Sequence, residues 1–494
     1  MKRLVSTLLV LIMIFTSMLT LASCDMLGLG GTGDGQGSGS GNGNASVDFV
    51  VPEGGYDGSA VTVTFYHTMG AALREVLDAA IVRFNALYPN IIIQHEQTGS
   101  YDDVRDTIKT EIAVGAQPNM AYCYPDHVAL YNLANAVVKL DSLIDSTITV
   151  TRDDGTTETL GLTAAQIADF IPGYYQEGAQ FDAAGTMYTL PMSKSTEVLY
   201  YNKTFFDANG LKVPTTWAEM EQVCAAIKAI DPTSIPLGYD SESNWFITMC
   251  EQYGSDYTST AAGQNFIFDN DTNYNFVKMF RDWYEKKYVT TQELNGGKYT
   301  SELFTATTGT KSYMSIGSSA GANHQRPEKV ENEYPFEVGI ATIPQVNPQN
   351  PQVISQGPSL CIFAKSNPQE VIATWLFTKF LATDVEFQAK FSMASGYVPV
   401  IKSVEQNSVY ADFLAKADGK EFLTALSAKQ CLAQADAYYT SPAFNGSSTA
   451  RDQVGILMQN CFSQAPKAGE SVLDMIKRLF ADAIEECEYH HPQD

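Results

Sequence analysis

The alternation of strand-like and helix-like segments after residue 59 constrains the fold of this chain more than any other feature of its sequence. Residues 60–67 read AVTVTFYH, with apolar residues at every second position, as in a half-buried strand. Apolar residues then recur at helical spacing until Pro89, and NIIIQHEQ follows as a second strand. This order predicts a β-α-β unit and a parallel sheet. The alternation continues to 119–124, so the predicted fold class is α/β.

The rest of the chain contains both kinds of segment. The stretch around 185–206 is extended and rich in strand formers, and strand-like sequences follow at 312–317, 336–344 and 359–366. A threonine N-cap with Glu219 in a capping-box position predicts the start of a helix. Helices dominate the middle of the chain and its C-terminal third, and no internal repeat is visible.

The N-terminus has the three-part layout of a secretory signal peptide, with two basic residues, an apolar stretch and then small residues. Its Ala22-Ser23-Cys24 resembles the lipobox of bacterial lipoproteins, which implies a signal peptide at 1–23 and lipidation of Cys24. The chain would then be exported and anchored to a membrane, facing the periplasm or the cell exterior. An uncleaved transmembrane anchor over 4–21 is the alternative, because that stretch is nearly long enough to span a bilayer.

Residues 24–59 are predicted to form a tether. Glycine alternates with small polar residues over much of this segment, and such a composition buries too little apolar surface to become ordered. A flexible coil of about twenty residues has a mean span on the order of 25 Å. A globular body on this tether would stay close to the membrane and remain free to reorient.

Composition argues against a protein that binds nucleic acid or anionic lipid, and against a small disulfide-stabilised scaffold. The net charge of −25 opposes binding to nucleic acid or to anionic lipid, and no basic cluster reverses it. Eight cysteines in 494 residues are too sparse for a disulfide scaffold. Apart from Cys24, the cysteines stand singly in apolar surroundings and are expected to be buried thiols, although a disulfide between two of them stays open.

No enzyme or metal signature is present in the sequence. The six histidines have neither the i, i+4 spacing nor the cysteine spacing of a zinc site. GxSxG and Walker sequences are absent, and the glycines of the tether precede no strand-helix unit that could hold a phosphate. We therefore expect no enzyme activity, no metal and no cofactor.

Several stretches resemble one family, the extracellular solute-binding receptors of ABC importers, in the branch of the maltodextrin and glycerol-3-phosphate receptors. The most specific is YTLPMSKSTEVLYYNKTFFDANGLKVPTTWAEM at 188–220, which is similar to that branch's crossover followed by Pro-x-Thr-Trp. FYHTM, GSYDD and FLATDVEFQAKFSMASGYVPV support it, and the last resembles the family's Gly-Tyr-x-Pro element. The resemblance spans roughly residues 60 to 485.

The resemblance implies a periplasmic-binding-protein-like fold, in which two α/β lobes joined by crossing strands enclose a ligand by hinge closure. It places lobe 1 at 60–192 and 338–374, and lobe 2 at 193–337 and 375–494. The lobe crossings are then expected near 190–196, 337–340 and 373–377. It also implies the partners: a small carbohydrate or polyol ligand and the permease subunits of an ABC transporter, with the receptor itself a monomer.

The same resemblance implies which residues line the cleft. Trp245 takes the place of a cleft tryptophan, with a core position as the alternative, and Glu242 stands where a second tryptophan is expected. Tyr101 takes the place of a ligand-contacting tyrosine, with a surface position at a helix start as the alternative. The expected lining is Tyr101, Ser195, Trp245, Ser318, Ser319, Gly357 and Tyr397, with His67, Asp126 and Glu242 as further candidates.

Two departures from the family pattern bear on the ligand. The arginine expected in an Arg-x-Gly context is replaced by Phe444-Asn445-Gly446, with Arg451 displaced, and the carboxylate expected after the third strand is offset to Asp126. A phosphorylated ligand is therefore disfavoured. Aromatic faces that stack on a sugar ring, surrounded by hydroxyl and carboxylate groups, favour a carbohydrate-like solute.

Three alternative functions stay open. One is a receptor for glycerol-3-phosphate or its diesters. Another is an anchored glycoside hydrolase, which needs two carboxylates across a sugar site, with Glu242, Glu197 and Asp126 as the candidates. The third is a surface adhesin, which predicts no buried small-molecule cleft.

Overall fold

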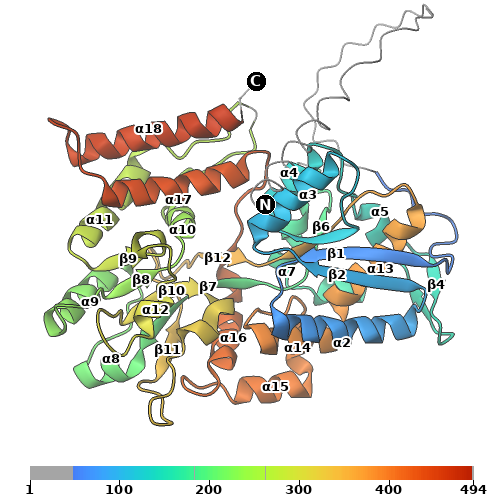
Figure 1. Cartoon of the computed structure of the whole chain (residues 1–494), viewed down its shortest axis with the longest axis horizontal. Coiled ribbons are helices and arrows are strands. Elements are labelled where there is room, and N and C mark those ends of the chain that lie inside the picture. Colours follow the sequence, from blue (N-terminus) through green and yellow to red (C-terminus); the bar gives the residue numbers. More distant parts are fainter. Residues whose placement is uncertain (1–47, 183, 262, 492–494) are drawn as a thin grey trace, which may run out of the picture. The chain divides into compact units, whose positions relative to one another are not determined.

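A computed structural model describes residues 48–182, 184–261 and 263–491 (Figure 1). The expected signal peptide at 1–23, the lipidation site Cys24 and the tether as far as residue 47 lie outside the described residues. The described residues belong to one compact unit that is built around two β-sheets. We call the part around the five-stranded sheet the first lobe and the part around the seven-stranded sheet the second lobe.

The sheet of the first lobe has the strand order β2-β1-β3-β13-β6. β1 pairs in parallel with β2 and β3, with Val61 opposite Ile91 and Phe65 opposite Met120, which confirms the predicted β-α-β unit and parallel pairing. β13 runs antiparallel between β3 and β6. The strands are β1 (Val61–His67), β2 (Ile91–Gln97), β3 (Met120–Cys123), β6 (Thr189–Pro191) and β13 (Ser359–Ile362).

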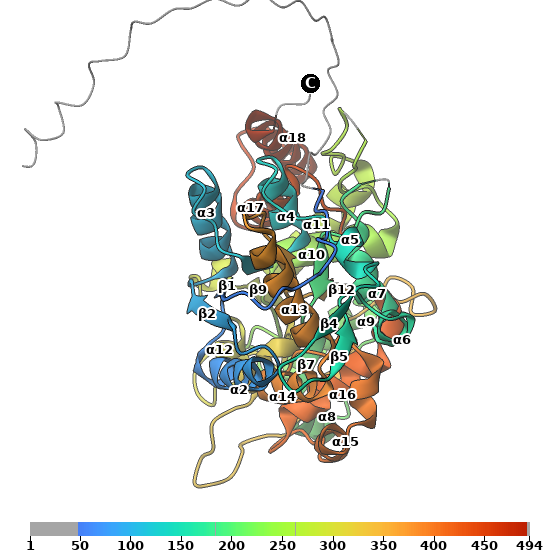
Figure 2. The ribbon, with the colours of Figure 1, turned by 90° about the vertical axis from the view of Figure 1, so that its right-hand side faces the viewer.

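Helices cover both faces of this sheet (Figure 2). Alternate strand residues face opposite ways. Phe65 lies in one buried cluster with Phe84 of α2, whereas Cys123 lies in another with Ile108 of α3. The helices of the first cluster are α2 (Ala71–Leu87), α13 (Pro368–Thr383), α14 (Val385–Ser395) and α15 (Ser408–Ala415), and those of the second are α3 (Tyr101–Ile112) and α4 (Pro125–Asn132).

Short elements complete the first lobe. β4 and β5 form a separate two-stranded sheet. The short elements are α5 (Asp141–Ile144), β4 (Thr149–Thr151), β5 (Thr157–Thr159), α6 (Ala164–Asp169), α7 (Pro172–Gln176) and the 3₁₀ helices η1 (Glu177–Ala179) and η4 (Lys402–Gln406).

The sheet of the second lobe has the order β14-β12-β7-β10-β8-β9, with β11 also paired to β7. β8, β9 and β10 are mutually parallel, and β7 runs antiparallel to β10. The strands are β7 (Ser195–Asn202), β8 (Leu237–Tyr239), β9 (Val289–Thr291), β10 (Met314–Ser318), β11 (Val338–Ala341), β12 (Val353–Gln356) and β14 (Tyr438–Tyr439).

Helices also cover both faces of the second sheet. The capping box predicted at Glu219 is present, since Thr216 and Glu219 exchange hydrogen bonds at the start of α9. The elements of this lobe are α8 (Lys203–Asn209), α9 (Trp217–Ile230), α10 (Glu242–Tyr253), α11 (Asp271–Glu285), η2 (Glu293–Asn295), α12 (Ser301–Phe304), η3 (Ser319–Gln325), η5 (Ala435–Ala437), α17 (Ser447–Ser463) and α18 (Val472–His490). Helix α16 (Leu423–Ala433) lies between the lobes, because Ala425 belongs to the first core and Cys431 to a cluster of the second lobe.

The chain passes between the sheets at three points that strand pairing defines. The first lies between β6 and β7, inside the expected range 190–196, the second lies between β12 and β13, and the third lies between β13 and β14. The expected crossings at 337–340 and 373–377 are wrong: β11 and β12 pair with β7 in the second sheet, and 373–377 lies within α13, in the first core. The sequence of an apolar strand or helix does not indicate which sheet it joins. The prediction therefore assigned 338–356 and α14 to the wrong lobe.

Two smaller findings concern the cysteines and the membrane. All seven cysteines of the described residues are buried free thiols: Cys123, Cys224, Cys250, Cys361, Cys431, Cys461 and Cys487. Among the described residues, no helix combines the length and the apolar character needed to cross a bilayer.

Candidate functional site

A polar compartment lies at the carboxyl ends of the parallel strands of the second sheet. Asp240 follows β8, Gln292 follows β9, and Ser318 ends β10; all three line one cavity of about 530 Å³. Side chains converge there because parallel strands end at the same edge of a sheet, where open α/β sheets commonly bind ligands. The volume falls within the usual range for small-molecule sites. We call this cavity the second-lobe compartment.

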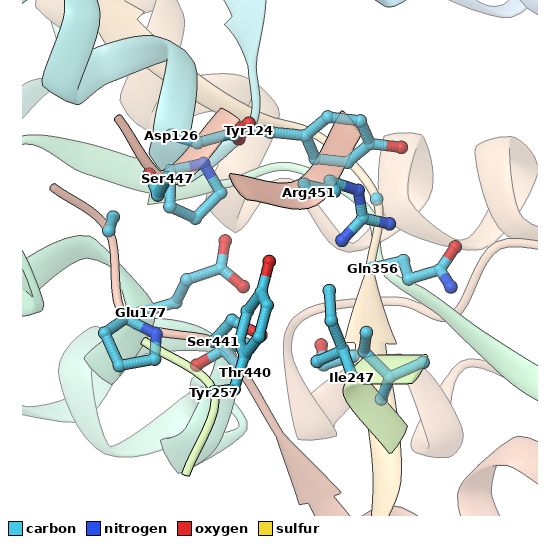
Figure 3. A pocket seen from close by; sticks show the side chains of 16 residues that line it. Tyr124, Asp126, Glu177, Ile247, Tyr257, Gln356, Thr440, Ser441, Ser447 and Arg451 are labelled. Carbon is cyan, nitrogen blue, oxygen red and sulfur yellow. The ribbon is translucent and has the colours of Figure 1, made fainter. Parts of the chain in front are cut away.

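A smaller cavity of about 80 Å³ lies between the lobes (Figure 3). Tyr124 and Asp126, at the start of α4, and Glu177 of η1 line it from the first lobe. Ile247 of α10 and Tyr257 line it from the second lobe. The start of α4 lies here because β3 ends at Cys123, at the edge of the first sheet that faces the second lobe. We call this space the interlobe cavity.

The two cavities adjoin each other, because Gln356 and Arg451 line both of them, and we refer to them together as the cleft. Gln356 ends β12, immediately before the chain returns to the first sheet. Arg451 belongs to the first turns of α17, and in Figure 3 its side chain points into the interlobe cavity below Tyr124. These two residues therefore occupy the junction where one ligand could contact both spaces.

A hydrogen-bonded chain connects Arg451 to the floor of the second lobe. Arg451 donates to Oδ1 of Asn244, the amide of Asn244 donates to Oε1 of Glu197 at 3.0 Å, and Tyr239 donates to Oε2 of Glu197. Burial raises the pKa of Glu197 to about 7, against the lowering effect of these hydrogen bonds and of Arg451. Among the described residues, no carboxylate forms an ion pair with Arg451.

Several buried polar atoms of the cleft have no hydrogen-bond partner among the described residues. They are Oγ of Ser355, Nε2 of Gln356 and Oγ of Ser441 in the interlobe cavity, and Oε1 of Gln325 in the second-lobe compartment. A buried polar group that lacks a partner is costly and therefore uncommon. Four such atoms lining one cleft are consistent with partners that a bound ligand supplies.

Tyrosine rings of the first lobe stack beside the interlobe cavity. The ring centroids of Tyr101 and Tyr124 are 4.4 Å apart, and Tyr122 lies parallel to Tyr101 at 6.4 Å. The hydroxyl oxygens of Tyr101 and Tyr397 are 3.4 Å apart. Tyr124 is the member of this group that reaches the cavity lining. The stack therefore holds one aromatic face against the space where a ligand would lie.

A buried ion pair joins the cleft to the crossing strands. The Nζ of Lys194 donates to Glu177, to the carbonyl of Gly357 at 3.1 Å and to Ser359 at 3.0 Å. Lys194 and Glu177 are both buried, at 0% and 2% exposure. The hydrogen bonds of Lys194 thus connect residues of the first two crossings, and Glu177 also lines the interlobe cavity.

The structure brings three of the expected lining residues to the cleft. Asp126 and Gly357 line the interlobe cavity, and Ser318 lines the second-lobe compartment. Gly357 has a φ of +100°, and a β-carbon there would lie 2.7 Å from the carbonyl oxygen of Ser193. The glycine thus permits the two crossing strands to approach each other closely.

Four other expected residues lie behind this lining. Ser195 is buried at the start of β7, opposite Gln356, and Ser319 is buried with its hydroxyl accepting from the N–H of Thr196 at 3.2 Å. Tyr101 and Tyr397 support Tyr124 from behind. These four residues position the cleft without appearing in the lining of either cavity.

The expectation for Trp245 is corrected by the structure. Its side chain is fully buried in the core of the second lobe, stacked on Tyr239 with a centroid distance of 4.7 Å and packed against Phe280 at 4.2 Å. The preceding residue, Asn244, faces the compartment instead. Successive residues of a helix point about 100° apart, so a one-residue difference in register exchanges a cleft position for a core position.

His67 and Glu242 are also placed away from the cleft lining. His67 is buried at the end of β1, where its Nδ1 accepts from the N–H of Met69 and its Nε2 lies 2.8 Å from Nδ1 of His95. Glu242 is the first residue of α10 and accepts from the N–H of Glu293 at 3.3 Å. Neither residue lines the interlobe cavity or the second-lobe compartment.

Sequence reasoning missed several lining residues. Tyr124 and Asp240 had a usable signal, because each directly follows a predicted or short strand, at the end where parallel strands gather ligand-binding groups. Arg451 and Gln356 had no such signal, because only tertiary packing shows where α17 and β12 lie.

Within the described residues, no group of three or more His, Cys, Asp and Glu side chains is arranged to hold a metal ion.

Comparison with known proteins gives one family and one fold. Residues 79–422 match the family described as bacterial extracellular solute-binding proteins. The sn-glycerol-3-phosphate-binding periplasmic protein UgpB of Shigella flexneri is 24% identical over 378 residues, which cover 74% of this chain and 80% of that protein.

Two solved structures illustrate the fold. UgpB from Mycobacterium tuberculosis, in complex with glycerophosphocholine, has a TM-score of 0.67 at 16% identity, covering 87% of this chain and 99% of its own. The GacH receptor of Streptomyces glaucescens, solved unliganded and with acarbose, has a TM-score of 0.64 at 17% identity, covering 86% and 98%. These likenesses confirm the expected periplasmic-binding-protein-like α/β fold.

Proposed function

Because the chain belongs to the family of bacterial extracellular solute-binding proteins, we propose that it is the receptor of an ABC importer for a carbohydrate or polyol. The observation that carries this proposal is the cleft whose two cavities meet at Gln356 and Arg451. The receptor would capture its solute between the lobes, close about the crossing strands as a monomer, and deliver the solute to the permease.

The chemistry of the cleft supports a polyhydroxylated ligand. Sugar hydroxyls both donate and accept hydrogen bonds, and the unpartnered atoms of Ser355, Gln356 and Ser441 offer both roles within one cavity. Tyr124 and Tyr257 add aromatic surface on which the apolar face of a sugar ring can stack. This combination of an apolar lining with a few placed polar groups is typical of small-molecule sites.

A second candidate, glycerol-3-phosphate or one of its diesters, is favoured by one observation. Arg451 enters the cleft from α17 although the Arg-x-Gly context is missing from the sequence, and it has no ion-pair partner among the described residues. A guanidinium group binds phosphate oxygens well. The loss of the sequence motif therefore no longer argues against a phosphate.

Calorimetric titration of the full chain separates these candidates. We expect neutral mono- and disaccharides to bind, and we expect Arg451→Gln to lower their affinity only slightly. Lys109→Gln, on the surface of α3, is the control. Tight binding of glycerol-3-phosphate alone, lost in Arg451→Gln, would favour the second candidate. Binding of neither class would contradict the proposed function.

An anchored glycoside hydrolase remains the alternative of another class. The three carboxylates considered for it are dispersed, because Asp126 lines the interlobe cavity, Glu197 lines the second-lobe compartment and Glu242 lines neither. We expect no sugar release when the protein is incubated for a long time with di- and oligosaccharides. Release that disappears in Asp126→Asn or Glu197→Gln would favour the hydrolase.

We further propose that the chain is a lipoprotein anchored through Cys24. The support is the signal-peptide layout with Ala22-Ser23-Cys24, and the family's extracellular location agrees with export. Cys24→Ser should release the protein from membranes into the soluble fraction and leave its ligand affinity unchanged. Persistent membrane association of this variant would instead support a transmembrane anchor.

A further inference from the structure

The second-lobe compartment contains several strong hydrogen-bond acceptors. Glu197, Asp240 and Glu302 contribute carboxylates to its lining, and Arg451 is the only arginine or lysine among the described residues that line it. The interlobe cavity is also lined by carboxylates, those of Asp126 and Glu177, and its unpartnered atoms are two hydroxyl groups and Nε2 of Gln356, a residue that lines both cavities. The feature that distinguishes the compartment is its unpartnered acceptor, Oε1 of Gln325.

The three carboxylates differ in how they are compensated. Glu302 lies 3.5 Å from Nζ of Lys298 and is largely exposed. Glu197 is connected to Arg451 through Asn244 and also accepts from Tyr239. Asp240 forms no ion pair with any described residue. Asp240 and Glu197 therefore both lack a direct cationic partner among the described residues, but each carboxylate oxygen of Glu197 accepts a hydrogen bond, from Asn244 or from Tyr239.

The geometry of Asp240 leaves one of its oxygens free. Oδ1 accepts from the backbone N–H and from the hydroxyl of Thr300, both at 2.7 Å. No described residue donates a hydrogen bond to Oδ2. A β-carbon at position 317 would lie 2.6 Å from Oδ2, so Gly317, which also lines the compartment, keeps that oxygen uncovered. Thr300 therefore fixes the carboxylate while Oδ2 remains available.

A second, independent observation points to a donor on the ligand. Gln325 is only 2% exposed, lines the same compartment, and its Oε1 has no hydrogen-bond partner among the described residues. A buried amide oxygen without a donor is unfavourable. The compartment thus presents an unpaired carboxylate oxygen and an unpaired amide oxygen, and both require a donor.

We propose that the second-lobe compartment binds a protonated primary amine of the solute, with Asp240 as its ion-pair partner and Gln325 as a further acceptor. This inference rests on the proposed function and narrows its ligand class to amine-bearing sugars or polyol derivatives. A sugar hydroxyl would satisfy the hydrogen bonds but would leave the partly buried charge of Asp240 unpaired. An ammonium group would satisfy the hydrogen bonds and also pair with that charge. The amine carries three N–H donors, which suits two separate acceptors.

Matched pairs of probes test this assignment on the wild-type full chain. D-glucosamine is compared by calorimetry with D-glucose and N-acetyl-D-glucosamine, and sn-glycero-3-phosphoethanolamine is compared with sn-glycerol-3-phosphate. We expect the amine of at least one set to bind about tenfold or more tightly than its amine-free matches. A preference for D-glucosamine would identify the ligand as an amino sugar. A preference for sn-glycero-3-phosphoethanolamine would identify it as an aminoalkyl phosphodiester.

Two variants assign the preference to the compartment. Asp240→Asn keeps an oxygen for the hydrogen bonds from Thr300 and should abolish the preference for the amine, because it weakens binding of the amine much more than binding of its amine-free match. Asp207→Asn, at an exposed carboxylate of α8 that is paired with Lys203 and lines neither cavity, is the matched control and should retain the preference. Gln325→Leu should reduce the preference severalfold.

The outcomes distinguish the inference from the proposed function. Equal affinity for amines and their amine-free matches, or a preference that survives in Asp240→Asn, overturns the inference and leaves the receptor function intact. Absence of binding by every probe overturns both. The wild-type comparison requires no substitution, so the inference remains testable even if a variant fails to fold.

Discussion

Asn244 and Trp245 are neighbours in α10, yet they serve different parts of the molecule. Asn244 joins Arg451 to Glu197 at the cleft, whereas Trp245 lies in the core against Tyr239 and Phe280. Tyr239 in turn donates to Glu197, so the core ring stack supports the polar chain from below. For these residues, the direction in which the side chain points from the helix determines its role more than its chemical identity does.

The first prediction concerns Trp245. Trp245→Ala should lower the free energy of unfolding by about 3–5 kcal/mol, because it removes a large, fully buried side chain and leaves a cavity. Trp245→Phe should cost less, since it fills most of that volume and removes an indole N–H that has no partner among the described residues. Chemical denaturation measures both. An unchanged unfolding curve together with lost ligand affinity would instead indicate that Trp245 contacts the ligand in the cleft.

The second prediction concerns Glu197. Burial raises its pKa to about 7 from an ordinary 4.5, so the folded protein retains this proton at a pH where the unfolded chain has lost it. The contribution to the free energy of unfolding is therefore fully present below about pH 4.5 and is lost as pH rises through 7. Glu197→Gln mimics the protonated carboxyl group and should abolish this loss, on the order of 3 kcal/mol.

Denaturation of the unliganded protein at about pH 5 and pH 8 measures this difference. The wild type should lose more stability between the two than Glu197→Gln does, and Glu302→Gln, on the exposed rim, should behave like the wild type. Parallel pH profiles for the wild type and Glu197→Gln would show that the carboxyl group of Glu197 titrates normally.

Among the elements, the first two crossing segments are the ones that position the cleft. Residues between β6 and β7 approach those between β12 and β13 closely enough that Gly357 has no room for a β-carbon. Backbone hydrogen bonds in both directions between Lys194 and Val398 bring the segment after α14 to the same place. The Gly-Tyr-x-Pro stretch therefore belongs structurally to the crossing region.

The third prediction concerns the buried pair between Lys194 and Glu177. Lys194→Met leaves the carboxylate of Glu177 buried without a cation and should lower the free energy of unfolding by about 3–5 kcal/mol. Combining it with Glu177→Leu replaces both charges by apolar groups and should recover most of that loss. Denaturation of both single variants and the double variant gives the coupling energy. Additive losses would contradict a direct pair.

At the scale of the whole molecule, the two sheets with their separate cores meet at a cleft that contains side chains of both. Arg105 of α3 reaches Ser448 of α17 at 3.2 Å, and Gln180 donates to Thr440. Besides these polar contacts, Tyr174 of the first lobe stacks on Tyr438 of β14 with a centroid distance of 5.6 Å.

The fourth prediction concerns closure. Ligand should pull the lobes together about the crossing segments, so the radius of gyration measured by solution scattering should decrease at saturating ligand. The scattering mass should correspond to a monomer with and without ligand. A control with a sugar that does not bind in calorimetry should leave the curve unchanged. An identical curve at saturation with a true ligand would point to a rigid cleft.

The sequence by itself determined the local elements and the family. Alternation at 60–67 predicts a strand because a strand exposes alternate residues to the core, and the capping pattern at Glu219 predicts a helix start because it satisfies backbone N–H groups locally. The resemblance at 188–220 located the first crossing, since that motif includes the crossing itself. These features depend on neighbours a few residues apart, which a sequence displays directly.

Tertiary structure alone decided which elements meet. β11 and β12 read as strands, but only their hydrogen bonds to β7 place them in the second sheet. Residues of α13 are buried on nearly every side, so its sequence has no polar face to show which core it joins. Arg451 reaches the cleft through the packing of α17, about two hundred residues away in sequence from its partner Asn244. Contacts between distant segments are set by packing that no local pattern encodes.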